Sequence, residues 1–94
     1  MTDFWPKLNS GLLFRDFENE GILLNPSTSN YYRITGVGVR ITQMLINKGE
    51  HGFNQALNLL IDEMERETDA DRETISHAIE TFLNKLKAER IIIS

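Results

Sequence analysis

The stretch that decides the fold is Gly21–Ile34, GILLNPSTSNYYRI, together with the Thr35-Gly36-Val37-Gly38 segment that follows it. The apolar run Ile22–Leu24 predicts a strand, which stops at Asn25-Pro26 because proline cannot donate to a sheet ladder. Serine, threonine and asparagine then supply turn chemistry, and Tyr31–Ile34 predicts the next strand. The stretch therefore indicates two antiparallel strands leading into a helix.

The pattern extends outward in both directions from this hairpin. A first strand is expected at Leu12–Phe17, before a hairpin turn at Glu18–Gly21. Residues 1–10 are expected to form an extended lead-in that Phe4 and Trp5 anchor by packing onto the domain. Three amphipathic helices follow, with apolar stripes at Val37, Ile41, Met44 and Leu45; at Phe53, Ala56, Leu57, Leu60, Ile61 and Met64; and at Ile75, Ile79, Phe82, Leu83 and Leu86.

Capping residues predict where these helices begin and end. Thr35 is expected to cap the first helix through its hydroxyl, and Lys48-Gly49 to end it, glycine being the usual residue past a C-terminus. Thr68-Asp69 is expected to cap the third helix. The long loop Asn47–Asn54 leaves the start of the second helix open. Ile91–Ile93 is expected to close the chain as a short extended segment.

The predicted fold is α+β: an N-terminal three-stranded antiparallel sheet followed by three helices, similar to a winged helix-turn-helix. A length of 94 residues predicts a single domain spanning 1–94. The longest apolar runs cover three or four residues, so no membrane association is expected, and no signal peptide is recognisable. A cytoplasmic location is the default expectation.

Few residues are suited to catalysis or metal binding. The absence of cysteine excludes disulfides and thiolate metal sites. The two histidines, His51 and His77, are far apart in sequence, and Thr81 stands where a helical metal site would need a ligand. Gly36-Val37-Gly38 lacks the further glycine and lysine of a phosphate-binding loop. We therefore predict no metal, no cofactor and no enzymatic activity.

The charge distribution bears on nucleic-acid binding. The net charge is −4, and the acids concentrate between residues 62 and 73. A winged-helix transcription regulator is the alternative that this topology allows. However, the candidate recognition helix, Asp71–Arg90, carries no net positive charge and begins with acids, whereas DNA binding needs a basic face. No nucleic-acid partner is therefore expected. The acidic tract is either a solvated helix end or a surface for a basic partner.

Three features together resemble the PqqD-like family, the precursor-recognition domains of ribosomally synthesised, post-translationally modified peptides. They are Leu23-Leu24-Asn25-Pro26, Tyr32-Arg33-Ile34-Thr35 leading into a helix, and a last helix with Phe82-Leu83-Asn84-Lys85-Leu86 before Ile91-Ile92. The resemblance covers roughly residues 8–93. Family members often have asparagine at the position of Thr35.

The resemblance implies a non-catalytic, peptide-binding function. The leader segment of a precursor peptide would add as a strand to the outer edge of the third strand, with side chains in a groove against the third helix. The partner enzyme would be a radical-SAM maturase or a leader protease with a cyclase. Carried over to this sequence, the peptide-binding residues are Tyr31, Tyr32, Arg33 and Ile34 on the strand, and Ile75, Ala78, Ile79, Phe82 and Lys85 on the helix.

Several alternatives stay open at this point. Tyr32 and Ile34 share one face of the strand and are expected to enter the core, while Tyr31 and Arg33 share the other face. Which tyrosine faces the groove is undecided, and the apolar residues of the third helix fit a plain core equally well. Arg33 is either a solvated arginine or a contact for an acidic leader residue. The chain is a monomer or a dimer formed through the exposed edge.

Overall fold

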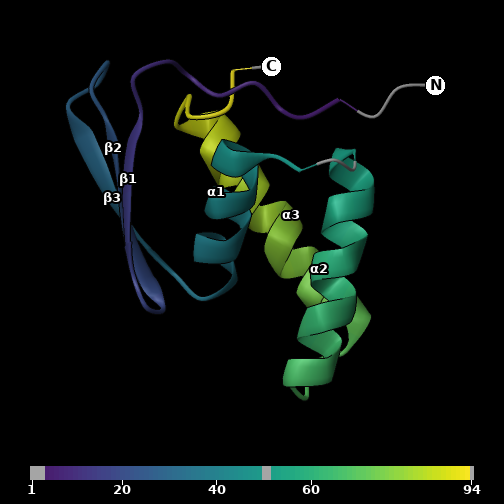
Figure 1. The fold of residues 1–94 in the computed structure, drawn as a ribbon. Coiled ribbons are helices and arrows are strands. Elements are labelled where there is room, and N and C mark those ends of the chain that lie inside the picture. Colours follow the sequence, from purple (N-terminus) through teal and green to yellow (C-terminus); the bar gives the residue numbers. More distant parts are fainter. Residues whose placement is uncertain (1–3, 50–51, 94) are drawn as a thin grey trace.

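The computed structural model describes residues 4–49 and 52–93 and confirms the predicted α+β fold (Figure 1). A three-stranded antiparallel sheet in the order β1-β2-β3 precedes three helices. The bounds are β1 Leu13–Phe17, β2 Glu20–Asn25, β3 Asn30–Thr35, α1 Val37–Asn47, α2 Phe53–Glu67 and α3 Arg72–Ala88. The start of the second helix, left open by the sequence, is Phe53.

The hairpins are tighter than expected. The predicted turn at Glu18–Gly21 is too long, because Phe17 and Glu20 already pair and only two residues connect β1 to β2. Glu18 takes a positive φ of 55° to close this turn. At the other end, Asn25 pairs with Asn30 and its side-chain oxygen accepts a hydrogen bond from the Ser27 amide at 3.1 Å. The second and third strands are therefore each longer than the apolar runs alone predicted.

Two of the predicted helix caps were wrong, whereas α1 ends before Lys48-Gly49 as predicted, with Lys48 as its C-cap. Thr35 is the last residue of β3, and Gly36, with a φ of 61°, precedes α1 without a side-chain cap. The positive φ after α1 belongs to Lys48 and not to Gly49. The cap of α3 is Asp71, whose carboxylate accepts a hydrogen bond from the Thr74 amide at 2.8 Å.

The helices cover one face of the sheet (Figure 1). Helix α1 contacts both β3 and α3, while α2 packs on α3 on the side away from the sheet. Gly38 permits the closest approach, since a Cβ placed there would lie 2.7 Å from Cγ2 of Ile34 and 3.0 Å from Cε1 of Phe82. The core is formed by Leu23, Ile34, Val39, Ile41, Leu45, Leu60, Ile61, Ile75, Ile79, Leu86, Ile91 and Ile92.

The two ends of the chain are joined to each other. Leu8 and Ile92 form an antiparallel bridge, which the Ile93 amide strengthens by donating to the Lys7 carbonyl at 2.8 Å. The ring of Trp5 packs against Phe53 with centroids 5.4 Å apart. Phe4 is 79% exposed, so the expectation that it also anchors the lead-in was wrong. Among the described helices, none is long and apolar enough to cross a membrane.

Candidate functional site

Strand β3 lies at an edge of the sheet, and its hydrogen bonds to β2 follow an alternating pattern. The Gly36 amide donates to the Asn19 carbonyl at 3.3 Å and so continues the β2–β3 register by one pair. Hydrogen-bonded and non-hydrogen-bonded pairs alternate in an antiparallel ladder. Counting back from Gly36, the residues of β3 that bond to β2 are therefore Ile34, Tyr32 and Asn30.

It follows that the N–H and C=O groups of Tyr31 and Arg33 point to the outer edge of the sheet. Within residues 4–49 and 52–93, no other strand pairs with β3 on this side. Such a row of unpaired backbone groups is a template for a further strand. The side chains alternate as expected: Ile34 is buried, Tyr32 is half-buried and both face the helices, whereas Tyr31 is 74% exposed on the opposite face.

A small groove, here called the β3 groove, lies between this edge strand and the C-terminal half of α3. Its cavity volume is about 30 Å³, which is close to the volume of one water molecule in the liquid. Aliphatic and aromatic side chains form its floor, and charged groups stand at its mouth. The lining residues are Tyr32, Arg33, Ile34, Phe82, Lys85, Leu86, Glu89 and Ile91.

One hydrogen bond crosses the β3 groove. The hydroxyl of Tyr32 donates to Oε2 of Glu89 at 2.9 Å and so links the strand to the residue that ends α3. This hydrogen bond to a carboxylate raises the pKa of the Tyr32 phenol above its ordinary value, because removing the proton would leave two negative oxygens in contact. Both residues of this hydrogen bond line the groove.

The structure brings together five of the nine residues predicted for the site, namely Tyr32, Arg33, Ile34, Phe82 and Lys85. Tyr31 lies at the same edge through its backbone, but its side chain is on the outer face of the sheet. Ile75 and Ile79 belong to the buried core, at 4% and 3% exposure. Ala78 is exposed and, like these two isoleucines, does not line the groove.

The groove lies further toward the end of α3 than the sequence led us to expect, and three of its residues were missed. Leu86 and Glu89 continue the helical spacing that starts at Phe82, so extending that series by one turn would have found them. Ile91 follows the helix and is 2% exposed. No sequence signal indicates that Glu89 bonds to Tyr32, because the contact joins residues 57 positions apart.

On the outer face of the sheet, the side chain of Arg33 pairs with Glu20. Both are exposed, at 73% and 47% of their side-chain surface. In the same cross-strand row, Ile22 lies between Arg33 and Arg15. Tyr31 lies beside Leu24 in the next row. Apart from Glu20, this face therefore carries basic and apolar side chains in these rows up to the β3 edge.

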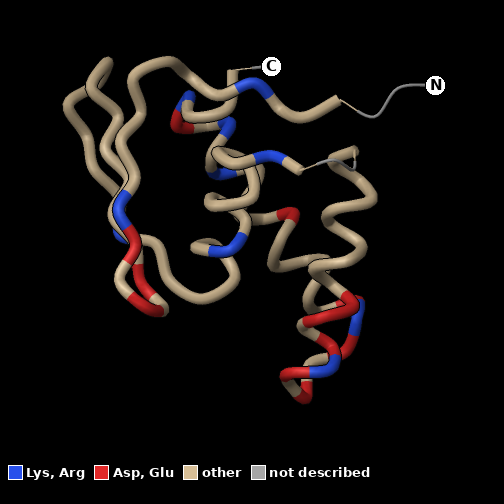
Figure 2. Tube along the Cα trace, viewed as in Figure 1, with Lys and Arg blue, Asp and Glu red and all other residues tan. Residues whose placement is uncertain are grey.

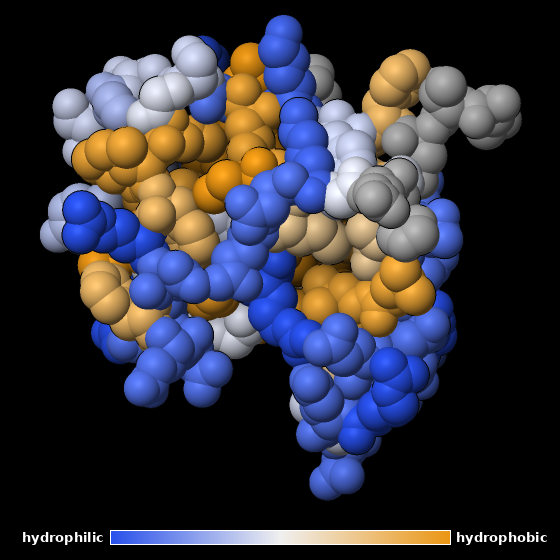
Figure 3. Space-filling view, in the orientation of Figure 1, coloured by the Kyte–Doolittle hydropathy of each residue, from blue (hydrophilic) through white to orange (hydrophobic). Residues whose placement is uncertain are grey.

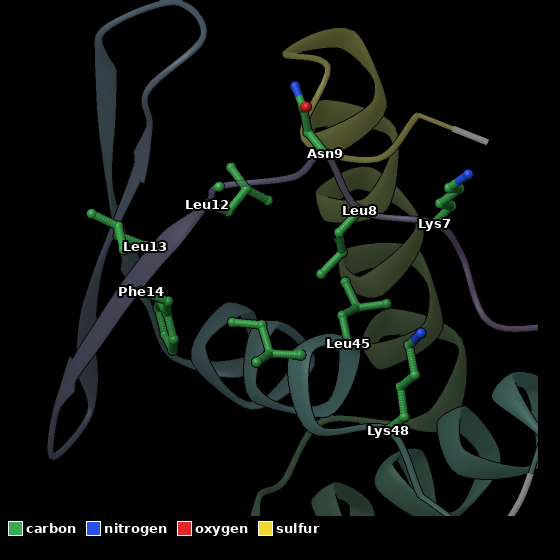
Figure 4. A pocket seen from close by; sticks show the side chains of 10 residues that line it. Lys7, Leu8, Asn9, Leu12, Leu13, Phe14, Leu45 and Lys48 are labelled. Atoms are coloured by element: carbon green, nitrogen blue, oxygen red, sulfur yellow. The ribbon is translucent and has the colours of Figure 1, made fainter.

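A larger hollow, here called the β1 hollow, lies at the opposite edge of the sheet, between β1, the segment before it and α1 (Figure 4). It has a volume of about 560 Å³ and is lined by Lys7, Leu8, Asn9, Gly11, Leu12, Leu13, Phe14, Leu45, Ile46 and Lys48. Leu8 and Leu45 point toward each other across it, and both lysines lie at the end away from β1. None of the predicted site residues lines this hollow.

Most acidic residues lie outside both cavities, whose linings contain one acid, Glu89. Figure 2 shows acidic residues gathered at the end of α2 and the start of α3, and Figure 3 shows that this end is covered by hydrophilic side chains. Arg72 bonds to Glu65 there at 3.0 Å, and Arg40 bonds to Glu67 at 2.8 Å. In the part of the chain that the structure describes, no three acidic or histidine side chains cluster as metal ligands would. His51 lies outside that part.

Comparisons with known proteins bear on the family and the fold. A solved structure described as "TbiB1 in Complex with the TbiA(beta) Leader Peptide" has a TM-score of 0.72 to this chain. The two are 22% identical, over 92% of this chain and 93% of that chain, so the likeness is one of fold. No curated protein matches. The model of the family described as "Coenzyme PQQ synthesis protein D (PqqD)" matches residues 20–92, which run from the first residue of β2 to the isoleucines after α3, and the chain therefore belongs to the PqqD family.

Proposed function

We propose that this protein captures the leader segment of a ribosomally made precursor peptide by strand addition at β3 and presents it to a modifying enzyme. The observation that carries the proposal is the outer edge of β3, where the backbone groups of Tyr31 and Arg33 lie next to a groove on α3. Membership of the PqqD family supports a role in peptide maturation. The neighbour TbiB1, solved with a leader peptide, supports a peptide ligand for this fold.

Strand addition suits a module that must bind one segment among many. Backbone pairing provides affinity that depends little on sequence, while the pockets beside the edge choose among side chains. Affinity between micromolar and nanomolar requires a net binding free energy of about 8–12 kcal/mol. Backbone hydrogen bonds along β3 combined with apolar contacts to Ile34, Phe82 and Leu86 can supply it.

The role is non-catalytic. Binding the leader turns the encounter between the rest of the peptide and the enzyme into an effectively intramolecular event, which raises the local concentration of the segment to be modified. A radical-SAM maturase or a leader protease with a cyclase is the class of enzyme we propose as the partner. Single-domain organisation and a cytoplasmic location go with this role.

The test is a binding titration with the leader of a ribosomally made precursor peptide, chosen from any short reading frames that lie beside this gene. The leader is labelled with fluorescein, and its fluorescence anisotropy is followed as the protein is added. We expect saturable binding at micromolar concentration or below. A scrambled leader of the same composition is the control for charge and hydrophobicity. Failure of the folded protein to bind, or equal binding of the scrambled peptide, would contradict the proposal.

A DNA titration under the same conditions tests the winged-helix alternative. The charge pattern of α3, with acids in its first turn, predicts no binding to duplex DNA at physiological salt. Tight, salt-dependent DNA binding without leader binding would transfer the function to that alternative.

A further inference from the structure

A peptide strand added at β3 would present side chains to two different surfaces. Successive residues of a strand point to opposite faces, so half of its side chains would meet the β3 groove. The other half would lie on the outer face of the sheet, beside Tyr31 and Arg33. This inference rests on the proposed function and concerns which peptides that edge selects.

The inner surface has little room for selection by charge. The β3 groove holds about 30 Å³, and the Tyr32–Glu89 hydrogen bond occupies one end of it. Its floor is formed by Ile34, Phe82 and Leu86, which carry no polar atom on their side chains. Lys85 and Glu89 also line the groove, but their opposite charges offset each other, so the groove discriminates mainly by size and hydrophobicity.

The outer surface, in contrast, carries a cation at the edge itself. The guanidinium of Arg33 is largely exposed, and its partner Glu20 is exposed as well. Exposed ion pairs of this kind contribute little to stability and exchange partners readily. A residue of an added strand directly opposite Arg33 would have its Cβ about 5 Å from that of Arg33, within reach of the guanidinium.

The rest of the molecule does not attract acidic peptides. The chain carries a net charge of −4, so the overall field opposes the approach of a carboxylate. Arg15 lies in the same cross-strand row as Arg33 but two strands further in, about 10 Å away at the usual strand spacing. A preference for an acidic side chain would therefore have to come from Arg33 locally.

We propose that this chain selects leader peptides that carry a carboxylate on the outward-facing side of the added strand, opposite Arg33, and that Glu20 competes with this carboxylate for the guanidinium. Arginine suits the role because its planar fork binds a carboxylate through two parallel hydrogen bonds. Glu20 keeps Arg33 paired when no peptide is bound, so an incoming carboxylate has to displace it from the guanidinium.

The experiment uses the fluorescein-labelled leader described above, with each residue replaced in turn by glutamate and by glutamine. The ratio of the two dissociation constants at each position measures the preference for negative charge. We expect a preference of about fivefold at a position that faces outward, as for a partly exposed charge-assisted pair. The positions immediately before and after it would face the groove and show no preference.

Three protein variants identify the side chain that causes the preference for negative charge. Arg33→Gln should abolish the preference, and Glu20→Gln should increase it. Arg15→Gln is the matched control, because it removes the same charge from the same face and should leave the preference unchanged. The inference is overturned if the leader binds but the ratio is equal in the wild type and Arg33→Gln, or if Arg15→Gln lowers it as much. If the unmodified leader does not bind the wild type at all, the proposed function fails first.

Discussion

The two edge strands of the sheet differ in what their inward-facing side chains do. Strand β3 points Tyr32 and Ile34 toward the helices, and its inner face is uncharged. Strand β1 points Asp16 inward, where the carboxylate accepts a hydrogen bond from the side-chain amide of Gln43 on α1. An inward-facing charge on an edge strand is a known protection against pairing with another chain. The comparison teaches that a strand at an edge is not by itself a binding site.

By volume, however, the cavity beside β1 is the larger of the two. The β1 hollow has a volume of about 560 Å³, against about 30 Å³ for the β3 groove. Size alone would favour the β1 side as the ligand site. We favour β3 because its edge combines outward backbone groups with apolar inward neighbours, and because strand addition requires the edge more than it requires a deep cavity.

A pair of proline substitutions tests this comparison most strongly. The N–H of Arg33 points outward, so Arg33→Pro removes a donor for an added strand and leaves the β2–β3 ladder complete. On β1, alternation from the same register places the N–H of Asp16 at the opposite outer edge. We expect Arg33→Pro to weaken leader binding by at least about 30-fold, as for the loss of a backbone hydrogen bond plus strain in the paired strand, and Asp16→Pro to leave it unchanged.

The measurement is leader anisotropy together with circular dichroism of both variants. Arg33→Ala separates the loss of the side chain from the loss of the backbone donor. If Arg33→Pro folds and binds normally, strand addition at β3 is wrong. If Asp16→Pro is the variant that loses binding, the peptide uses the β1 edge instead.

A pair of glycine substitutions, one beside each cavity, tests which cavity matters for leader binding. A Cβ at Gly38 would meet Ile34 and Phe82, two residues of the β3 groove. A Cβ at Gly21 would lie 2.5 Å from Cε1 of Phe14, whose ring borders the β1 hollow, and 3.3 Å from the carbonyl oxygen of Arg15. Gly38→Ala, after the gain in helix propensity, and Gly21→Ala should therefore each lower the free energy of unfolding by about 1–2 kcal/mol.

Chemical denaturation measures both effects, and leader binding shows where they act. We expect about tenfold weaker binding for Gly38→Ala, since a displacement of Ile34 or Phe82 alters the surface that the peptide contacts. Gly21→Ala should bind as the wild type does. Equal binding losses in the two variants would mean that leader binding does not depend on the β3 groove in particular.

The order and type of all six elements were predictable because each rests on local signals: an apolar period, a proline turn, a glycine. The helix caps were not, since Thr35 continues the β3 ladder and a sheet register depends on partners outside the local sequence. The site shows the same division. Tyr32, Phe82 and Lys85 were carried over from the family resemblance and do line the groove, whereas the choice between Ile79 and Leu86 depends on where α3 crosses β3. Glu89 enters only through a long-range hydrogen bond.

The smallest expected effect concerns that hydrogen bond and its dependence on pH. The carboxylate of Glu89 raises the pKa of Tyr32 in the folded protein. The bond therefore stabilises the fold below about pH 10, the ordinary pKa of tyrosine, and this contribution is lost as the pH rises through the folded-state pKa. Tyr32→Phe should lower the thermal midpoint by a few degrees or less at pH 8, and the difference from the wild type should shrink toward pH 11.

The effect of Tyr32→Phe on leader affinity tests whether the peptide binds at the β3 edge. The phenylalanine ring retains the apolar contact, but Glu89 no longer holds one end of the β3 groove closed. We expect the affinity for leaders with a bulky inward-facing residue to rise by about twofold to threefold, at the low end of the contribution of one hydrogen bond. The β1 edge has its own cross-link, between Asp16 and Gln43, and Gln43→Ala should produce no such gain. A loss of affinity in Tyr32→Phe would instead mean that the hydroxyl contacts the peptide directly.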